Sequence, residues 1–298
     1  MAPPQNQVLF DSEFLKKLEY LYIVSKRLFR GQWKGEKRSL HRGTSVEFKD
    51  YRNYVPGDDL RYLDWNIFKR LDKLLIKLFE EEEEHYIYIL LDASRSMNFG
   101  NPNKMVYAKK VAAALAYIGL ANQDRVSLAT FNEEVTTTMP FVRGKGQIFN
   151  IFKFLTPVEA DKGTEINRSL ASYIHQIKRR GIVILLSDLL DPHGYETGLK
   201  QFIYKKFDAY LIHLLDSQEI YPSQLSGDLK LIDSETGEIK EVAITKKVLM
   251  DYSAAFLEYC NEIQGFCNQH GITYIRSATQ IPFEELILKV FRKGGFLR

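Results

Sequence analysis

Two uninterrupted apolar runs constrain the fold of this 298-residue chain more than any other feature. They span residues 86–91 (Tyr-Ile-Tyr-Ile-Leu-Leu) and 182–186 (Ile-Val-Ile-Leu-Leu), and each has the length of a strand that is buried on both faces. From residue 86 onward, strand-like runs alternate with helix-length segments. Strands that are separated by helices predict a parallel sheet with right-handed crossovers. We therefore expect an α/β fold with a central, mostly parallel sheet that is flanked by helices.

The alternation predicts the bounds of the individual elements. Strands are expected at 86–92, 126–131, 135–139, 182–187, 208–215 and 272–276. Helices are expected at 12–30, 103–121, 145–155, 164–180, 194–206, 246–269 and 282–293. These elements suggest an N-terminal helix and accessory β-segment in residues 1–84 and a main domain in residues 85–298. A β-hairpin near 228–243 interrupts the main domain, and we expect it to join the N-terminal strands in a small accessory β-region.

Polar side chains gather where the predicted strands end. Asp92, Ser94 and Ser96 follow the first apolar run, and Asp188 follows the second. Thr164 opens a helical stretch between the two runs. Loops at the carboxyl ends of parallel strands meet at the same edge of a sheet, so we expect these residues to lie close together. Carboxylates and neutral hydroxyls, without thiolate or imidazole, suit a hard cation such as Mg²⁺ rather than zinc.

This set resembles the metal-ion-dependent adhesion site (MIDAS) of von Willebrand factor A (vWA) domains. That family's pattern is D-x-S-x-S, then a threonine, then an aspartate, and it maps in order onto Asp92, Ser94, Ser96, Thr164 and Asp188. The resemblance implies a Rossmann-like vWA fold that holds Mg²⁺, or Mn²⁺ or Ca²⁺, at these residues. It also implies a partner protein that supplies an aspartate or glutamate to the metal. The simpler interpretation, in which Asp92 and Ser94 only cap the next helix, leaves Thr164 and Asp188 unexplained.

A second motif precedes the first apolar run. Residues 52–65 follow the pattern R-x-Y-x-P-G-D-D-x-R-x-L-D-W, and we expect their arginines and aspartates to form a paired network that locks this segment onto the main domain. Together with residues 43–48 (GTSVEF) and 233–238 (DSETGE), this motif resembles a bacterial family catalogued as domain of unknown function 58. Members contain a vWA-like fold and are commonly encoded beside MoxR-type AAA+ ATPases. The resemblance therefore implies an adaptor or co-chaperone that works with such an ATPase.

Composition favours a cytoplasmic protein without a membrane span. The N-terminus lacks a signal-peptide pattern, and the longest apolar run, residues 111–121, is too short to cross a bilayer. The two cysteines, Cys260 and Cys267, would share one face of a predicted helix, and their spacing matches neither a disulfide framework nor a zinc motif. We expect both to be buried, reduced thiols, as is typical of cytosolic proteins.

One alternative function is enzymatic. The placement of Asp92, Asp188 and Asp191 also resembles Mg²⁺-dependent aspartyl-phosphate hydrolases, with Lys162 as a candidate phosphate-binding residue. Those enzymes carry a second carboxylate two residues after the first aspartate. This chain has Ser94 there, whose hydroxyl has no useful pKa for acid–base work, so we expect no enzymatic activity.

A second alternative is nucleic-acid binding through the basic segment 30–42, which includes Trp33. Such binding would weaken steeply as the salt concentration rises. The formal net charge of only +3 argues against this function, and we expect no nucleic-acid partner.

Overall fold

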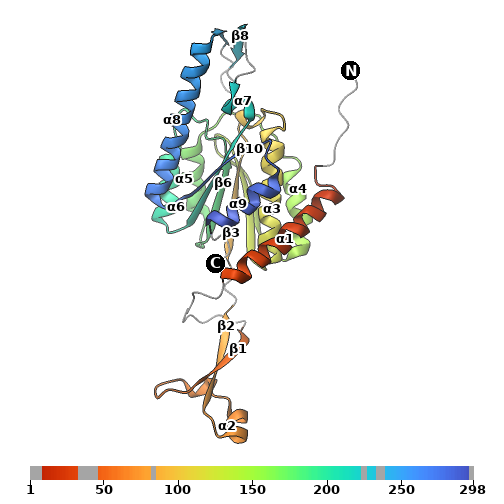
Figure 1. Ribbon diagram of the computed structural model, residues 1–298, viewed down its shortest axis with the longest axis vertical. Coiled ribbons are helices and arrows are strands. Elements are labelled where there is room, and N and C mark those ends of the chain that lie inside the picture. Colours follow the sequence, from red (N-terminus) through yellow and green to blue (C-terminus); the bar gives the residue numbers. More distant parts are fainter. Residues whose placement is uncertain (1–8, 33–45, 82–84, 223–226, 233–238, 295–298) are drawn as a thin grey trace. The chain divides into compact units, whose positions relative to one another are not determined.

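A six-stranded sheet forms the centre of the part of the chain that follows residue 84 (Figure 1). The computed structural model describes residues 9–32, 46–81, 85–222, 227–232 and 239–294. The sheet strands are β3 (Tyr86–Asp92), β4 (Arg125–Phe131), β5 (Val135–Arg143), β6 (Ile182–Ser187), β7 (Asp208–Leu215) and β10 (Thr273–Ala278). Their order is β10-β7-β6-β3-β4-β5, and β5 alone in this sheet runs antiparallel to its neighbour. The mostly parallel sheet confirms the expected α/β, Rossmann-like fold.

Helices cover both faces of this sheet (Figure 1). One face packs against α1 (Ser12–Gln32), α3 (Lys104–Ala121), α4 (Ile148–Leu155) and α9 (Phe283–Gly294). The other face packs against α5 (Ile166–Gln176), α6 (Glu196–Tyr204) and α8 (Lys246–His270). Alternate residues of β3 serve the two cores: Ile87 and Ile89 face the first, and Tyr88 and Leu90 the second. A strand buried in this way must be apolar throughout, as residues 86–91 are.

Helix α1 belongs to the larger of two compact units. The larger unit comprises residues 1–32 and 85–298, and the smaller comprises residues 33–84. Phe14, Leu18 and Leu21 of α1 are buried in the first core. The structure thus groups α1 with the main domain. The expected boundary at residue 84 places it with the accessory β-segment instead.

Leu18 tests this packing because its side chain is fully buried. We expect Leu18→Ala to lower the free energy of unfolding by about 2–5 kcal/mol, through lost apolar burial and the cavity that remains. Tyr20→Ala is the matched control on the same helix, since that side chain is 62% exposed. Urea denaturation measures both variants. Equal, small changes in the free energy of unfolding would contradict the packing of α1 in the first core.

The smaller unit contains an antiparallel pair, β1 (Val46–Asn53) with β2 (Leu75–Glu81), and helix α2 (Trp65–Leu71). The Arg52 guanidinium binds both carboxylate oxygens of Asp58, at 2.5 and 2.6 Å. Asp64 caps α2 and accepts a hydrogen bond from Tyr51, a residue of β1. These partners lie close together in sequence, so they stabilise the turn of the segment itself. The expected attachment of the segment to the main domain stays a prediction.

The hairpin near 228–243 also differs from expectation. Its strands β8 (Gly227–Ile232) and β9 (Ile239–Ile244) pair with each other and form a separate two-stranded sheet. They do not join β1 and β2, which likewise pair together. Closing a short loop between neighbouring strands costs less conformational entropy than bringing distant strands together, and this favours the local pairing. The motif residues 233–238 lie outside the described residues.

Both cysteines match the prediction. Cys260 and Cys267 are buried, free thiols on α8. Within the described ranges, none of the helices combines the length and the apolar character that crossing a membrane requires.

Candidate metal centre

The candidate centre lies at the carboxyl ends of β3 and β6. These two strands are neighbours in the sheet, and the strand order reverses between them. The chain leaves β3 toward β4 on one side and later returns to β6 on the other side. In open α/β sheets, this reversal opens a crevice in which ligands bind. Asp92 ends β3, and Asp188 follows the last residue of β6.

Four of the five predicted site residues are joined by hydrogen bonds. Asp92 Oδ1 accepts from the Ser94 backbone N–H at 2.9 Å, and Asp92 Oδ2 accepts from the Ser187 hydroxyl at 2.5 Å. The Oγ atoms of Ser94 and Ser96 share a hydrogen bond of 3.0 Å. The Ser96 hydroxyl then donates to Asp188 Oδ1 at 3.2 Å. All these side chains are buried, so the two strand ends form one continuous polar cluster.

Thr164 lies in a loop that makes hydrogen bonds to the segments that follow β3 and β6. On one side, the Arg95 backbone N–H donates to the Lys162 carbonyl oxygen at 2.6 Å. On the other side, the Ile166 backbone N–H donates to Asp191 Oδ2 at 2.6 Å. Helix α5 was expected from residue 164, but it begins at Ile166, and Thr164 stays in the loop. Its Oγ1 is buried and has no hydrogen-bond partner among the residues that the structure describes.

An unpartnered buried hydroxyl needs an explanation, because leaving it unpaired costs about 1–3 kcal/mol. A bound cation would supply one, and the surrounding spacings fit. Adjacent ligands of an octahedral Mg²⁺ with bonds of 2.0–2.1 Å are about 2.9 Å apart. The Ser94–Ser96 and Ser96–Asp188 oxygen separations are 3.0 and 3.2 Å. The described part of the chain has no cluster of three or more His, Cys, Asp or Glu side chains placed to hold a metal, so a cation here would depend on the hydroxyls.

The structure adds Lys104 and Glu219 to the site. Lys104 is the first residue of α3, and its Nζ lies 2.7 Å from Asp188 Oδ2 and 2.5 Å from Glu219 Oε1. Glu219 belongs to the short helix α7 (Ser217–Ile220). Sequence reasoning missed both residues. One signal was present: a lysine in the first turn of a helix opposes the helix dipole.

Burial and charge set the protonation of the cluster. Burial, followed by the negative charge of Asp188, raises the pKa of Asp92, since two nearby carboxylates resist joint ionisation. Burial alone would lower the pKa of Lys104. Its ion pairs with Asp188 and Glu219 outweigh that effect and raise the pKa above its usual value, so Lys104 is a cation.

Side chains of neighbouring elements form hydrogen bonds with the backbone that follows β6. His213 lies 3.0 Å through Nε2 from the Asp188 carbonyl oxygen and 2.8 Å through Nδ1 from the Tyr274 hydroxyl. A carbonyl only accepts, so the neutral ring carries its proton on Nε2. Leu189, which follows Asp188, adopts a left-handed φ of 57°. Its carbonyl oxygen accepts a hydrogen bond from the Tyr259 hydroxyl. Such a conformation in a bulky residue persists only where its surroundings enforce it.

His213 makes acid stability testable, because burial lowers its pKa to about 4. Between pH 6.5 and about 4, the unfolded state binds a proton that folded His213 does not. Its contribution is therefore fully present above pH 6.5 and is lost as the pH falls, by about 2–3 kcal/mol at pH 4.5. Urea denaturation of wild type and His213→Gln at pH 7 and 4.5 isolates this term from other groups. Equal losses in the two proteins would contradict it.

Asp191 and Lys162 were considered for phosphate hydrolysis, and segment 30–42 for nucleic-acid binding. Asp191 accepts backbone hydrogen bonds from Ile166 at 2.6 Å and His193 at 2.8 Å, so it positions the start of α5. Lys162 is exposed. The basic segment 30–42 lies outside the described residues apart from the end of α1.

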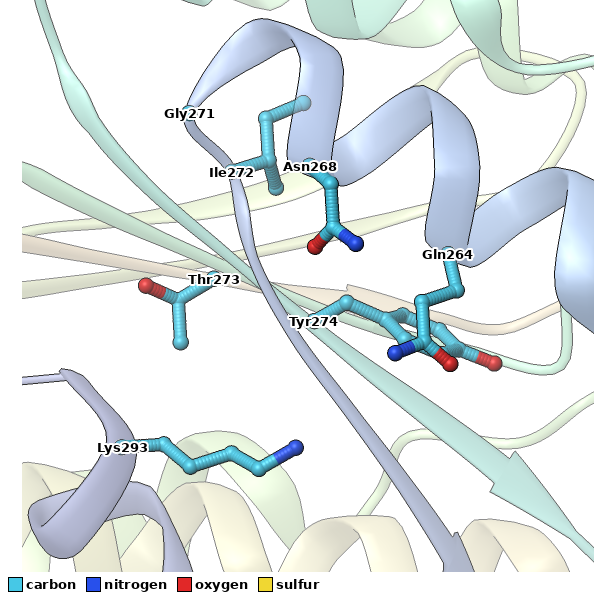
Figure 2. Close-up of a pocket in the computed structure, with 7 residues that line it drawn as sticks. All are labelled: Gln264, Asn268, Gly271, Ile272, Thr273, Tyr274 and Lys293. Carbon is cyan, nitrogen blue, oxygen red and sulfur yellow. The ribbon is translucent and has the colours of Figure 1, made fainter.

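A separate depression lies far from this cluster along the strands. Figure 2 shows it between the last turns of α8, with Gln264 and Asn268, and the start of β10, with Thr273 and Tyr274. Lys293 of α9 approaches from the other side. Because β10 is parallel to β7, its first residues lie at the amino end of the sheet, opposite the candidate centre.

Comparison with known proteins gives a family and several more distant likenesses. The uncharacterized protein Rv1480 of Mycobacterium tuberculosis is 25% identical over 252 residues, which cover 82% of this chain and 78% of that protein. Two solved structures are each 13% identical and cover 71% of this chain and 98% of theirs. They are BatB from Bacteroides thetaiotaomicron (TM-score 0.46) and an aerotolerance-related membrane protein from Bacteroides fragilis (TM-score 0.47). The model of the family "Protein of unknown function DUF58" matches residues 50–260, which is more than half of the chain. The chain therefore belongs to the DUF58 family of proteins of unknown function.

Proposed function

We propose that this protein is a metal-dependent protein-interaction module of the vWA type, with a MIDAS-like centre at the ends of β3 and β6. The observation that carries the proposal is the buried Thr164 hydroxyl, which has no partner among the described residues beside a cluster of oxygen donors. A buried polar atom without a partner among the described residues suits a ligand that comes from outside the chain.

The donor set favours binding to a partner over hydrolysis. Ser94, Ser96 and Thr164 offer neutral oxygens, and Asp92 and Asp188 offer carboxylates. When bound, Mg²⁺ or a similar divalent cation would supply Lewis acidity for one further oxygen ligand. Neutral hydroxyls neutralise little of the cation's charge, so that further ligand is best an anion. An aspartate or glutamate side chain of another protein meets this need.

The loops at this edge of the sheet also favour a protein partner. Phe99 follows β3, Leu190 follows β6 and Ile281 follows β10, and these side chains are 45%, 42% and 37% exposed. All three loops leave the carboxyl ends of parallel strands, so they share one edge with the candidate centre. Exposed apolar side chains around a polar centre are typical of surfaces that bind proteins.

The partner that we propose is a MoxR-type AAA+ ATPase, with this chain as its adaptor or co-chaperone in the cytoplasm. This step rests on the family resemblance that the sequence motifs carry. The family match supports it only at the level of a DUF58 protein.

A pull-down from the lysate of the source organism tests the proposal, with Mg²⁺ or with EDTA. The baits are wild type, Thr164→Val and a control, Thr130→Val, whose hydroxyl bonds to Thr136 and Thr137 instead. We expect an AAA+ ATPase, identified by mass spectrometry, on wild type and the control in Mg²⁺ only. Capture that ignores both EDTA and Thr164→Val would contradict a metal-dependent interaction. Phosphatase turnover that Asp92→Asn abolishes would instead identify an enzyme.

A further inference from the structure

Lys104 contacts the candidate centre but is not part of its donor set. Its side chain is fully buried, and its Nζ bridges Asp188 Oδ2 at 2.7 Å and Glu219 Oε1 at 2.5 Å. The other oxygen of Asp188 accepts from the Ser96 hydroxyl. A positive charge of the protein is therefore bound to the same carboxylate that faces the cluster.

Stability alone gives a poor account of this placement. Lys104 lies at the first position of α3, where the helix dipole disfavours a cation. Taking an ion pair out of water also costs about as much as its attraction returns, so apolar residues of similar volume would serve the fold at least as well. A role in the chemistry of the centre explains why a buried lysine stands here.

We propose that Lys104 is a built-in counter-ion that lowers the affinity of the centre for divalent cations, an inference that rests on the proposed function. A cation that reaches Asp92 and Asp188 meets an ammonium group already bound to Asp188. Two positive charges repel strongly where water is excluded. The affinity of the centre is therefore lower than its carboxylates alone would give.

This arrangement makes cation binding depend on the partner. The carboxylate of a partner adds the negative charge that Lys104 cancels, so the cation and the partner bind cooperatively. Such coupling is reciprocal: each ligand raises the affinity for the other by the same factor. Glu219 extends the contact to other elements, since its Oε2 accepts from the Asp216 backbone N–H and its carbonyl oxygen accepts from the Tyr252 hydroxyl of α8.

Isothermal titration with Mn²⁺ and Mg²⁺ tests the proposal on the full chain. We expect Lys104→Met to bind the cation about tenfold more tightly than wild type, which corresponds to about 1.4 kcal/mol. Lys104→Gln removes the charge but keeps a hydrogen-bond donor for the carboxylates, so it serves if the methionine variant folds poorly. Lys109→Met is the matched control. It removes another buried lysine of α3, one that donates to the Thr156 carbonyl oxygen at 3.1 Å, and should leave affinity unchanged.

The outcomes separate this inference from the proposed function. Tighter binding by both Lys104 variants, and not by Lys109→Met, would support it. Wild-type binding with equal or weaker binding by the Lys104 variants would overturn the counter-ion role and leave the metal centre standing. Absence of binding in wild type and in every variant would overturn the metal centre, and the counter-ion role with it.

Discussion

Asp92→Asn is expected to abolish divalent-cation binding and to make the cation-free protein more stable. Asp92 is fully enclosed, and burial and Asp188 raise its pKa. Ionisation at neutral or higher pH therefore destabilises the folded state relative to the unfolded state. An asparagine removes that charge and keeps an oxygen that can accept from the Ser94 N–H. We expect a gain of about 1–2 kcal/mol in the free energy of unfolding at pH 8.

The pH dependence gives this prediction its sign. Wild type loses stability as the pH rises from the ordinary range of a carboxyl group through the raised pKa of Asp92. The difference between Asp92→Asn and wild type should therefore widen as the pH rises and close at low pH, where Asp92 is protonated in both states. Urea denaturation in EDTA measures the difference. Asp208→Asn, at an exposed position at the start of β7, is the control.

Cation binding gives the opposite result in the same variant. Isothermal titration should show an affinity for Mn²⁺ at least about 100-fold weaker in Asp92→Asn than in wild type, since the variant loses one of two carboxylates of the site. A variant that is both less stable than wild type and equally able to bind Mn²⁺ would show that Asp92 serves the fold alone.

Thr164→Val is expected to separate binding from stability even more cleanly. Valine keeps the shape of threonine and removes the hydroxyl, whose Oγ1 is without a partner among the described residues. Removing a buried, unpaired polar atom should leave the free energy of unfolding unchanged or raise it by about 1 kcal/mol. Mn²⁺ affinity should fall about tenfold or more, because a neutral donor is lost.

Thr130→Val is the matched comparison for that variant. Thr130 is also buried, but its Oγ1 lies 2.7 Å from Thr136 Oγ1 and 2.6 Å from Thr137 Oγ1. We expect this substitution to lower the free energy of unfolding by about 1–2 kcal/mol and to leave Mn²⁺ affinity unchanged. Urea denaturation and titration of both variants decide the matter. A loss of stability in Thr164→Val as large as in Thr130→Val would identify a structural hydroxyl.

The sheet and four members of the cluster were predictable from local pattern. A strand buried on both faces must be continuously apolar, so residues 86–91 and 182–186 predict central strands of the sheet. The carboxyl ends of parallel strands share one edge, and this alone brings Asp92 and Asp188 together. The unpartnered state of the Thr164 hydroxyl was beyond such reasoning, because it depends on how three loops pack.

Lys104 and Glu219 show where sequence reasoning stops. They form an ion pair although they are 115 residues apart, and Lys104 meets Asp188 across 84 residues. Only the packed fold specifies such contacts. The Arg52–Asp58 pair is the reverse case, since its partners are six residues apart. That short separation brings the two side chains together within the segment itself.

A crystal structure of the wild-type protein, grown with Mn²⁺ and measured at a wavelength where manganese scatters anomalously, would show whether the cluster holds a metal. We expect an anomalous peak beside the hydroxyl oxygens of Ser94, Ser96 and Thr164, at metal–oxygen distances of about 2.0–2.3 Å. A well-ordered centre with no peak, and with the Thr164 hydroxyl bonded to protein or water, would contradict it.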